Sequence, residues 1–241
     1  MSLLARIRAR LSGEAGFTLP ELLAAMVIGG VILTAAATIM QRSFFASNQI
    51  ADRVESVQRG RHAMDMVTRQ LRSSVCVGST LPLLAGSASS LTFTGDLTNG
   101  SAALPTQKRV LTFAPGTTGQ TLTQTTYAMT AGPPTSTTVT WGTTGTTSTL
   151  LTGAVNDGSS PFFEYWGWDT ALTTPVFRQL TAPLSAADIA RVTEIRINFA
   201  VAPEHASTHS DVGTTLNDRI TLPQADPNQT DPNKKTVTPT C

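Results

Sequence analysis

Few residues in this 241-residue sequence combine in a way that could bind a metal or carry out catalysis. His205 and His209 have the spacing of zinc ligands on a helix, but Pro203 and the surrounding Ser, Thr and Gly favour a loop. Asp226 and Asp231 could bind calcium in Asp-Pro turns, although the pattern of an EF-hand loop is absent. The sequence contains no phosphate-binding loop, dinucleotide fingerprint or nucleophile elbow. We therefore expect no catalytic residues, no metal site, no cofactor and no enzymatic activity.

An apolar run occupies residues 17–40 and contains one formally charged residue, Glu21. As a helix, this run spans about 36 Å, which is enough to cross a bilayer core. Residues 1–16 form a basic leader with three arginines and one glutamate. Because positive charge beside an apolar span stays in the cytoplasm, we expect a single-pass inner-membrane protein whose remaining chain is extracytoplasmic.

The small residues Ala15 and Gly16 precede the apolar run, whereas the cleavage site of an ordinary secretory signal follows it. Cleavage after Gly16 would leave the apolar helix on the mature protein. It would also create a new amino group at Phe17.

Glu21 needs an explanation, because a carboxylate costs roughly 2.5–3.5 kcal/mol at the bilayer centre and less near its edge. Thr18 and Glu21 have the spacing of a capping box, with Pro20 in the first helical turn. Alternatively, Glu21 neutralises a positive charge in an assembly, such as the α-amino group of Phe17 on a neighbouring subunit. The two roles are compatible.

Residues 16–23, GFTLPELL, resemble the class III signal of type IV pilins and pseudopilins. The resemblance implies that prepilin peptidase cuts after Gly16 and methylates Phe17, and that Glu21 guides assembly with other pilin or pseudopilin subunits. It also implies a pilin-like α+β fold. In that fold a long N-terminal helix, with a transmembrane first half, packs on a largely antiparallel β-sheet domain. The close match ends near residue 45.

The helical pattern continues through residues 41–76 as an amphipathic second half of the helix, with Gly60 as a single tolerated breaker. Apolar residues spaced three and four apart predict a stripe that packs on a globular domain. The stripe consists of Ile50, Val54, Val57, Met64, Val67, Leu71 and Val75. The opposite face is rich in arginine, and we interpret it as a solvated face rather than a nucleic-acid contact, because no aromatic residues interleave with the arginines.

Residues 77–225 read as a β-rich domain in which turn clusters separate short segments of strand-forming residues, a pattern that predicts a largely antiparallel sheet. The expected strands are 91–94, 109–113, 121–129, 137–141, 162–166, 176–180, 192–202 and 216–222. We expect a loop at 78–90 and a short helix at 184–191 with Ser185 as its N-cap. Residues 142–152 are compatible with a strand edge or a loop.

Six aromatic residues of this domain could form a ligand face, but we interpret them as core packing of the sheet against the helix. They are Trp141, Phe162, Phe163, Tyr165, Trp166 and Trp168.

The two cysteines, Cys76 and Cys241, are too few for the four ligands of a structural zinc site. Outside the cytoplasm we expect them to pair as a disulfide. Closing so long a loop contributes on the order of 5 kcal/mol and would hold residues 226–241, an expected extended tail, against the domain. The alternative is a buried Cys76 and a disordered Cys241.

The net charge of +1 excludes a strongly basic nucleic-acid coat, and direct nucleic-acid contact is not expected. The resemblance predicts a minor pilin-like structural subunit of the W or J type, with a role in initiation or at a filament tip. Membrane lipid surrounds its helix before assembly, and a cell-surface or periplasmic filament contains it afterwards. A type IV pilus, a competence pilus and a type II secretion pseudopilus (with a J-type pseudopilin) remain alternatives. So does an extracytoplasmic binding module anchored by an uncleaved helix.

Overall fold

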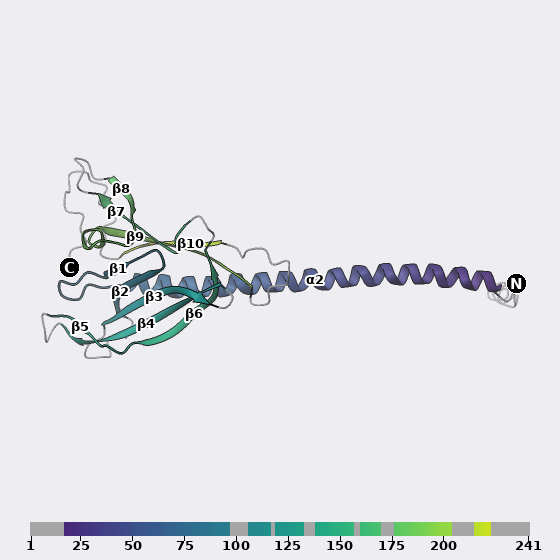
Figure 1. The fold of residues 1–241 in the computed structure, drawn as a ribbon, viewed down its shortest axis with the longest axis horizontal. Coiled ribbons are helices and arrows are strands. Elements are labelled where there is room, and N and C mark those ends of the chain that lie inside the picture. The colour runs from purple at the N-terminus through teal and green to yellow at the C-terminus, as the bar shows by residue number, and fades with distance from the viewer. Residues whose placement is uncertain are drawn as a thin grey trace, which may run out of the picture. The chain divides into compact units, whose positions relative to one another are not determined.

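A computed structural model describes residues 17–96, 106–116, 119–132, 138–156, 160–169, 176–203 and 215–222. One long helix, α2 (Leu19–Arg72), is followed by a β-sheet and a short helix, α3 (Ala186–Ile189) (Figure 1). The chain divides into two compact units, Met1–Ile50 and Ala51–Cys241, and α2 contributes residues to both. The predicted class, α+β with a long N-terminal helix and a largely antiparallel sheet, is confirmed. The boundaries predicted at residues 16, 40, 76 and 225 stay predictions.

Helix α2 ends at Arg72, whereas the helical pattern was expected to continue to residue 76. The N–H of Ser73 donates to the carbonyl oxygens of Arg69 and Gln70, which closes the last turn. Beyond it, the N–H of Val75 donates to the Thr94 carbonyl oxygen at 3.1 Å, and the Thr94 hydroxyl donates to the Val75 carbonyl oxygen at 2.7 Å. The chain therefore leaves the helix because pairing with a strand satisfies its backbone groups there.

In the described part of the chain, ten strands form one sheet, and every ladder in it is antiparallel. The strands are β1 (Leu83–Gly86), β2 (Ser90–Asp96), β3 (Thr106–Gly116), β4 (Gly119–Ala131), β5 (Thr140–Trp141), β6 (Thr146–Val155), β7 (Phe163–Asp169), β8 (Val176–Leu180), β9 (Val192–Val201) and β10 (Thr215–Thr221).

The main path of the sheet runs β1-β2-β3-β4-β6-β9-β7-β8, with β10 also paired to β9 and β5 to β4. Strand β9 is the junction of this sheet, because it pairs with β6, β7 and β10. Its sequence alternates between buried residues such as Ile195, Ile197 and Phe199 and the half-buried Arg196 and Asn198. This alternation gives the sheet one face for the core and one polar face.

The hydrophobic core of the second unit joins one face of α2 to the inner face of the sheet. From α2 it receives Ala63, Met64, Val67 and Leu71. Its largest fully buried side chains include Tyr165, Phe93, Phe163, Phe199, Leu91, Leu111 and Leu122. Of the six aromatic residues interpreted as core, Phe162, Phe163 and Tyr165 are buried, whereas the three tryptophans are only half-buried.

The predicted stripe on the helix is correct for Met64, Val67 and Leu71 and wrong for two of its members. Ile50 and Val54 are 65% and 49% exposed, and the buried positions of α2 begin at Ser56. A periodic apolar pattern identifies a face of a helix, but it does not say how much of that face is covered.

The structure explains why position 60 is a glycine, which the sequence alone did not show. A Cβ atom built on Gly60 would lie 2.8 Å from Cγ2 of Val201 and would also meet the side chain of Leu216. The absence of a side chain at this position therefore lets β9 and β10 approach α2 closely.

Two expectations for the β-rich part require correction. The expected loop at 78–90 contains β1, and among the described residues of the strand expected at 137–141 only Thr140–Trp141 are in a strand. Residues 142–152, which were compatible with a strand edge or a loop, contribute residues 146–152 to β6. Strand β6 is stabilised by pairing rather than by apolar alternation: Thr147 lies opposite Thr125, with 2.9 Å between their hydroxyl oxygens. The predicted short helix is confirmed as α3, and the Ser185 hydroxyl accepts a hydrogen bond from the Asp188 N–H at 3.1 Å.

Candidate functional site

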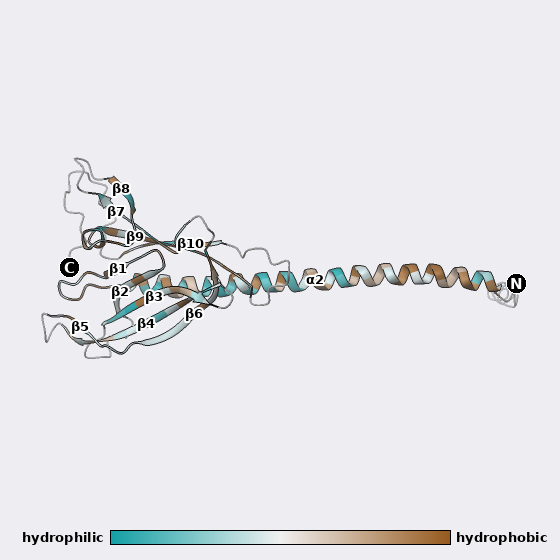
Figure 2. Cartoon of the chain, viewed as in Figure 1, coloured by the Kyte–Doolittle hydropathy of each residue, from teal (hydrophilic) through white to brown (hydrophobic). Residues whose placement is uncertain are grey.

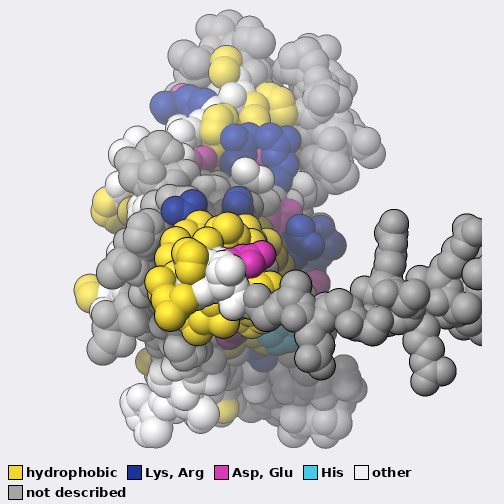
Figure 3. All heavy atoms as spheres, turned by 90° about the vertical axis from the view of Figure 1, so that its right-hand side faces the viewer, with side chains coloured by type: hydrophobic (Ala, Val, Ile, Leu, Met, Phe, Trp, Pro, Cys, Tyr) yellow, Lys and Arg dark blue, Asp and Glu magenta, His cyan; other side chains and the backbone are white. Residues whose placement is uncertain are grey.

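The first part of α2 is apolar and has no cover within the chain. All residues from Phe17 to Ile50 are exposed except Gly29, which is half-buried. The hydropathy colouring shows this part of α2 as mainly hydrophobic (Figure 2). In the space-filling view, hydrophobic side chains surround the helix, and acidic side-chain atoms lie among them (Figure 3). Burying one large apolar side chain is worth about 1.5–3 kcal/mol, so exposing this surface to water is strongly unfavourable.

The charges around this surface fit the thickness of a membrane. Twenty residues without a formal charge, 22–41, separate Glu21 from Arg42. At a rise of 1.5 Å per residue they span about 30 Å, which is the thickness of a typical hydrocarbon core. Among the described residues, α2 is the one helix that is long and apolar enough to cross a membrane.

Glu21 lies in the first turn of α2, and backbone contacts close that turn. The N–H of Glu21 donates to the Thr18 carbonyl oxygen at 2.9 Å, and the N–H of Leu22 donates to the same oxygen at 3.1 Å. Within residues 17–96, no side-chain hydrogen bond joins Thr18 to Glu21, so the reciprocal capping box is not formed. The Glu21 carboxylate is exposed, and its position in the chain leaves it able to meet a charge from outside.

The polar groups inside the apolar run are satisfied locally. The Thr34 hydroxyl donates to the Gly30 carbonyl oxygen at 2.7 Å, and the Thr38 hydroxyl donates to the Thr34 carbonyl oxygen at 2.8 Å. These bonds reduce the cost of placing hydroxyl groups in hydrocarbon. A Cβ atom at Gly29 or Gly30 would meet no atom within 4 Å, so packing within the described chain does not require glycine at either position. Small residues of this kind allow a second helix to approach closely.

The remaining residues predicted as sites are only partly described. Phe17 is 79% exposed and directly precedes α2. Gly16 and Cys241 lie outside the described residues, so cleavage after Gly16 and the disulfide with the half-buried Cys76 stay predictions. His205, His209, Asp226 and Asp231 also lie outside them. Within the ranges that the structure describes, no three His, Cys, Asp or Glu side chains gather as a metal site would require.

The predicted apolar run ended at Met40, and the exposed apolar surface goes further. Phe44 and Phe45 are 62% and 73% exposed and are separated from Arg42 by one residue, Ser43. These two side chains therefore extend the exposed apolar surface past the first charged residue that follows the apolar run. Their aromatic type at that position was the signal that could have extended the predicted site.

The comparison with protein families agrees with this geometry. Residues 11–37 match the model of the prokaryotic N-terminal methylation motif. No curated protein matches the chain. The matched segment contains Gly16, Phe17 and Glu21 and most of the uncharged run. Together, the motif and the exposed apolar helix support a type IV pilin-like or pseudopilin-like protein: a structural subunit with a single-pass membrane anchor and a C-terminal domain.

Proposed function

We propose that this chain is a minor pilin-like subunit that prepilin peptidase cleaves after Gly16 and methylates at Phe17. It then assembles with other pilin or pseudopilin subunits into a type IV pilus or a related filament, where it acts in initiation or at the tip. One observation carries the proposal: a methylation motif continues directly into an apolar helix that has no cover of its own. We place the chain among the minor subunits because its β-rich part is long.

The physical logic follows from the environment that this helix requires. In lipid, the uncharged run 22–41 satisfies its backbone groups internally and keeps its apolar side chains out of water. A bundle of equivalent helices at the core of a filament offers the same two conditions. Transfer from membrane to filament therefore exchanges one apolar environment for another, at little cost in burial.

Glu21 sets how neighbouring helices align when the subunit moves from the membrane into the filament. Cleavage after Gly16 puts a positive α-amino group four residues before Glu21 in every subunit. A carboxylate and an amine from neighbouring subunits satisfy each other in the apolar core, and a wrong register leaves both charges unpaired there. Such a pair selects one arrangement of subunits among many that bury similar apolar area.

Mass spectrometry of the amino-terminal peptide, from protein expressed in its own host, tests the processing step. The expected peptide begins at Phe17 and has the mass of one additional methyl group. A peptide that begins at Met1 or Ser2 would contradict the proposal and would leave the helix as an uncleaved anchor. A bulky substitution at Gly16 should abolish the trimmed peptide.

Substitution of Glu21 tests assembly separately from processing. We expect Glu21→Ala to be cleaved normally. Its incorporation into filaments should fall at least about tenfold below that of the parent, because the α-amino group of a neighbouring subunit loses its buried partner. The matched control is Glu14→Ala, since Glu14 lies in the leader that cleavage removes. Equal incorporation of Glu21→Ala and the parent, quantified by immunoblot of sheared filaments, would contradict the assembly role.

A further inference from the structure

A row of polar side chains crosses three strands on the outer face of the sheet. In the register of β7, β9 and β10, Glu164 lies opposite Arg196, and Arg196 lies opposite Arg219. Two like charges directly opposite each other on neighbouring strands are destabilising unless another charge compensates them. The placement of Arg196 and Arg219 therefore needs a reason.

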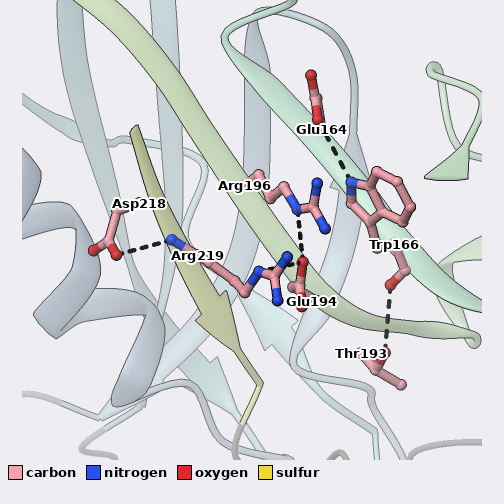
Figure 4. A network of polar contacts seen from close by, with 7 residues as sticks. All are labelled: Glu164, Trp166, Thr193, Glu194, Arg196, Asp218 and Arg219. Atoms are coloured by element: carbon pink, nitrogen blue, oxygen red, sulfur yellow. Dashed lines mark hydrogen bonds and ion pairs between the residues drawn. The ribbon is translucent and has the colours of Figure 1, made fainter. Parts of the chain in front are cut away.

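Glu194 provides the compensation. Its Oε1 atom accepts from Nε of Arg196 at 2.7 Å and lies 3.1 Å from Nε of Arg219. Figure 4 shows the two arginine side chains converging on this carboxylate. The Glu194 side chain is 9% exposed, so its position is fixed by the surrounding protein. One buried carboxylate thus holds two guanidinium groups side by side.

Both contacts use Nε, which leaves the outer Nη groups of both arginines for other partners. Within the described residues, no hydrogen bond or ion pair involves these Nη groups. The Arg196 guanidinium also lies over the Trp166 ring, 3.9 Å from its centroid, so its plane is fixed. The result is a pair of pre-oriented donor forks, the arrangement that recognises carboxylate and phosphate oxygens.

The donor forks border a concavity of about 550 Å³, which is within the range of small-ligand sites. It is lined by Arg196, Arg219, Glu164, Asp218, Asn198, Asn217 and Ser160. The side-chain amides of Asn198 and Asn217, which lie opposite each other, can each donate and accept hydrogen bonds. Glu194 and the two arginines together have a charge of +1, and Glu164 brings the formal charge of this group to zero. The Asp218 carboxylate accepts a hydrogen bond from the Thr68 hydroxyl at 2.7 Å. An anion is therefore held by the directed N–H donors of the two arginines rather than by an excess of positive charge.

We propose that this concavity binds a carbohydrate unit that carries an oxyanion, such as a sugar acid or a sugar phosphate. The two guanidinium groups hold the oxyanion, and the amides of Asn198 and Asn217 hold neighbouring hydroxyl groups. The lining has no aromatic or aliphatic side chain of the kind that anchors most protein interfaces, and arginine is the one anchor type that it shares with them. This binding site goes beyond the proposed filament function.

Calorimetric titration of the full-length chain in mild detergent tests the site, with sodium D-glucuronate as probe and D-glucose as its neutral counterpart. We expect glucuronate to bind with a Kd on the order of 1 mM, as expected for a ligand of this size, and added salt to weaken binding. Glucose should give no measurable heat. Absence of glucuronate binding, or equal binding of the two sugars, would overturn the proposal.

Three variants locate the binding. Arg219→Gln removes an arginine whose side chain is 62% exposed and should weaken glucuronate binding at least about tenfold. Arg178→Gln is the matched control, because the Arg178 side chain is 55% exposed and forms an ion pair with Asp169 at 2.7 Å, outside the concavity. It should leave Kd unchanged. Glu164→Gln removes a negative charge from the lining and should tighten binding, a gain that a poorly folded variant cannot produce.

Competing ligands separate the sources of the oxyanion. Glucose 6-phosphate that binds as well as glucuronate supports the shared oxyanion chemistry, whereas stronger binding of either sugar identifies the preferred group. Acetate or inorganic phosphate binding as tightly as the sugars would overturn the carbohydrate part of the proposal. An acidic peptide that binds more tightly than the sugars would overturn it in favour of a protein partner. None of these assays involves cleavage or assembly, so they can fail while the filament function holds.

Discussion

The two parts of α2 differ in where their stability comes from. Residues 19–50 expose nearly every side chain and have no core of their own. In the part that belongs to Ala51–Cys241, Ala63, Val67 and Leu71 are at most 1% exposed and pack into the core below the sheet. One continuous helix therefore combines a segment that depends on lipid or other subunits with a segment that depends on its own domain.

This difference separates folding from assembly along one element. Substitutions in the second part should change the stability of the domain, and substitutions in the first part should change how the chain inserts and assembles. All three tryptophans, Trp141, Trp166 and Trp168, lie in the second unit, so their fluorescence reports on the unfolding of the domain alone.

Truncation of a leucine in each part gives the largest expected contrast. Leu71 is fully buried, and Leu71→Ala should lower the free energy of unfolding of the domain by about 2–5 kcal/mol, because it removes apolar contacts and leaves a cavity. Leu33 is 71% exposed, and Leu33→Ala should leave this free energy unchanged. Urea unfolding in mild detergent, followed by tryptophan fluorescence, measures both. Equal losses for the two variants would show that the first part stabilises the domain and would break the comparison.

The two parts also use glycine differently, which gives a contrast of intermediate size. Gly60→Ala introduces a Cβ 2.8 Å from Cγ2 of Val201, and the overpacking should exceed the gain in helix propensity. We expect a net loss of about 1–2 kcal/mol in the unfolding free energy. Gly30→Ala meets no atom within 4 Å in the chain and should not change the unfolding of the domain.

In an assembly assay, the position that should be sensitive to substitution is Gly30 rather than Gly60. If neighbouring helices approach at Gly29 and Gly30, Gly30→Leu should reduce incorporation into filaments while the urea curve stays that of the parent. A Gly60→Ala domain as stable as the parent would contradict the close approach of β9 and β10 to α2.

The sequence predicted those features that depend on local pattern. The apolar run, the motif around Glu21, the N-cap at Ser185 and the alternation of β9 each follow from residues close together in the chain. The fold class was predictable for the same reason, because a long helical period followed by short strand-forming segments excludes most other architectures.

Features that depend on distant partners were missed. Gly60 read as a helix breaker because nothing near it in sequence reveals Val201 or Leu216. Four of the ten residues of β6 are threonines, and three of these pair with threonines of β4, so no apolar alternation marks that part of the strand. The polar face of β9 was visible, but the position of Arg219 opposite Arg196 depends on the register of β10.

The smallest expected effect is the change in the unfolding free energy of the domain with pH, which involves only the second part of the comparison. The buried Tyr165 hydroxyl donates to the carbonyl oxygen of Ser87 at 2.9 Å, and burial raises the pKa of Tyr165 above its usual value near 10. Below about pH 9 the hydroxyl is protonated in the folded and unfolded chain alike, so its contribution to stability is fully present. Above about pH 10 the unfolded chain releases this proton and the folded chain retains it, so stability falls by up to about 1.4 kcal/mol per pH unit.

Tyr165→Phe should lower the unfolding free energy by about 1 kcal/mol at neutral pH, through loss of the hydroxyl's hydrogen bonds, and should reduce the alkaline slope. Tyr127→Phe is the matched control and should keep the parent slope, because Tyr165 remains. The first part of α2 contains no tyrosine. We therefore expect the alkaline loss of stability, followed by tryptophan fluorescence, to depend on Tyr165 of the domain. An alkaline slope that is the same in Tyr165→Phe and in the parent would show that other groups destabilise the domain at high pH, and that burial of this hydroxyl is not what couples its stability to pH.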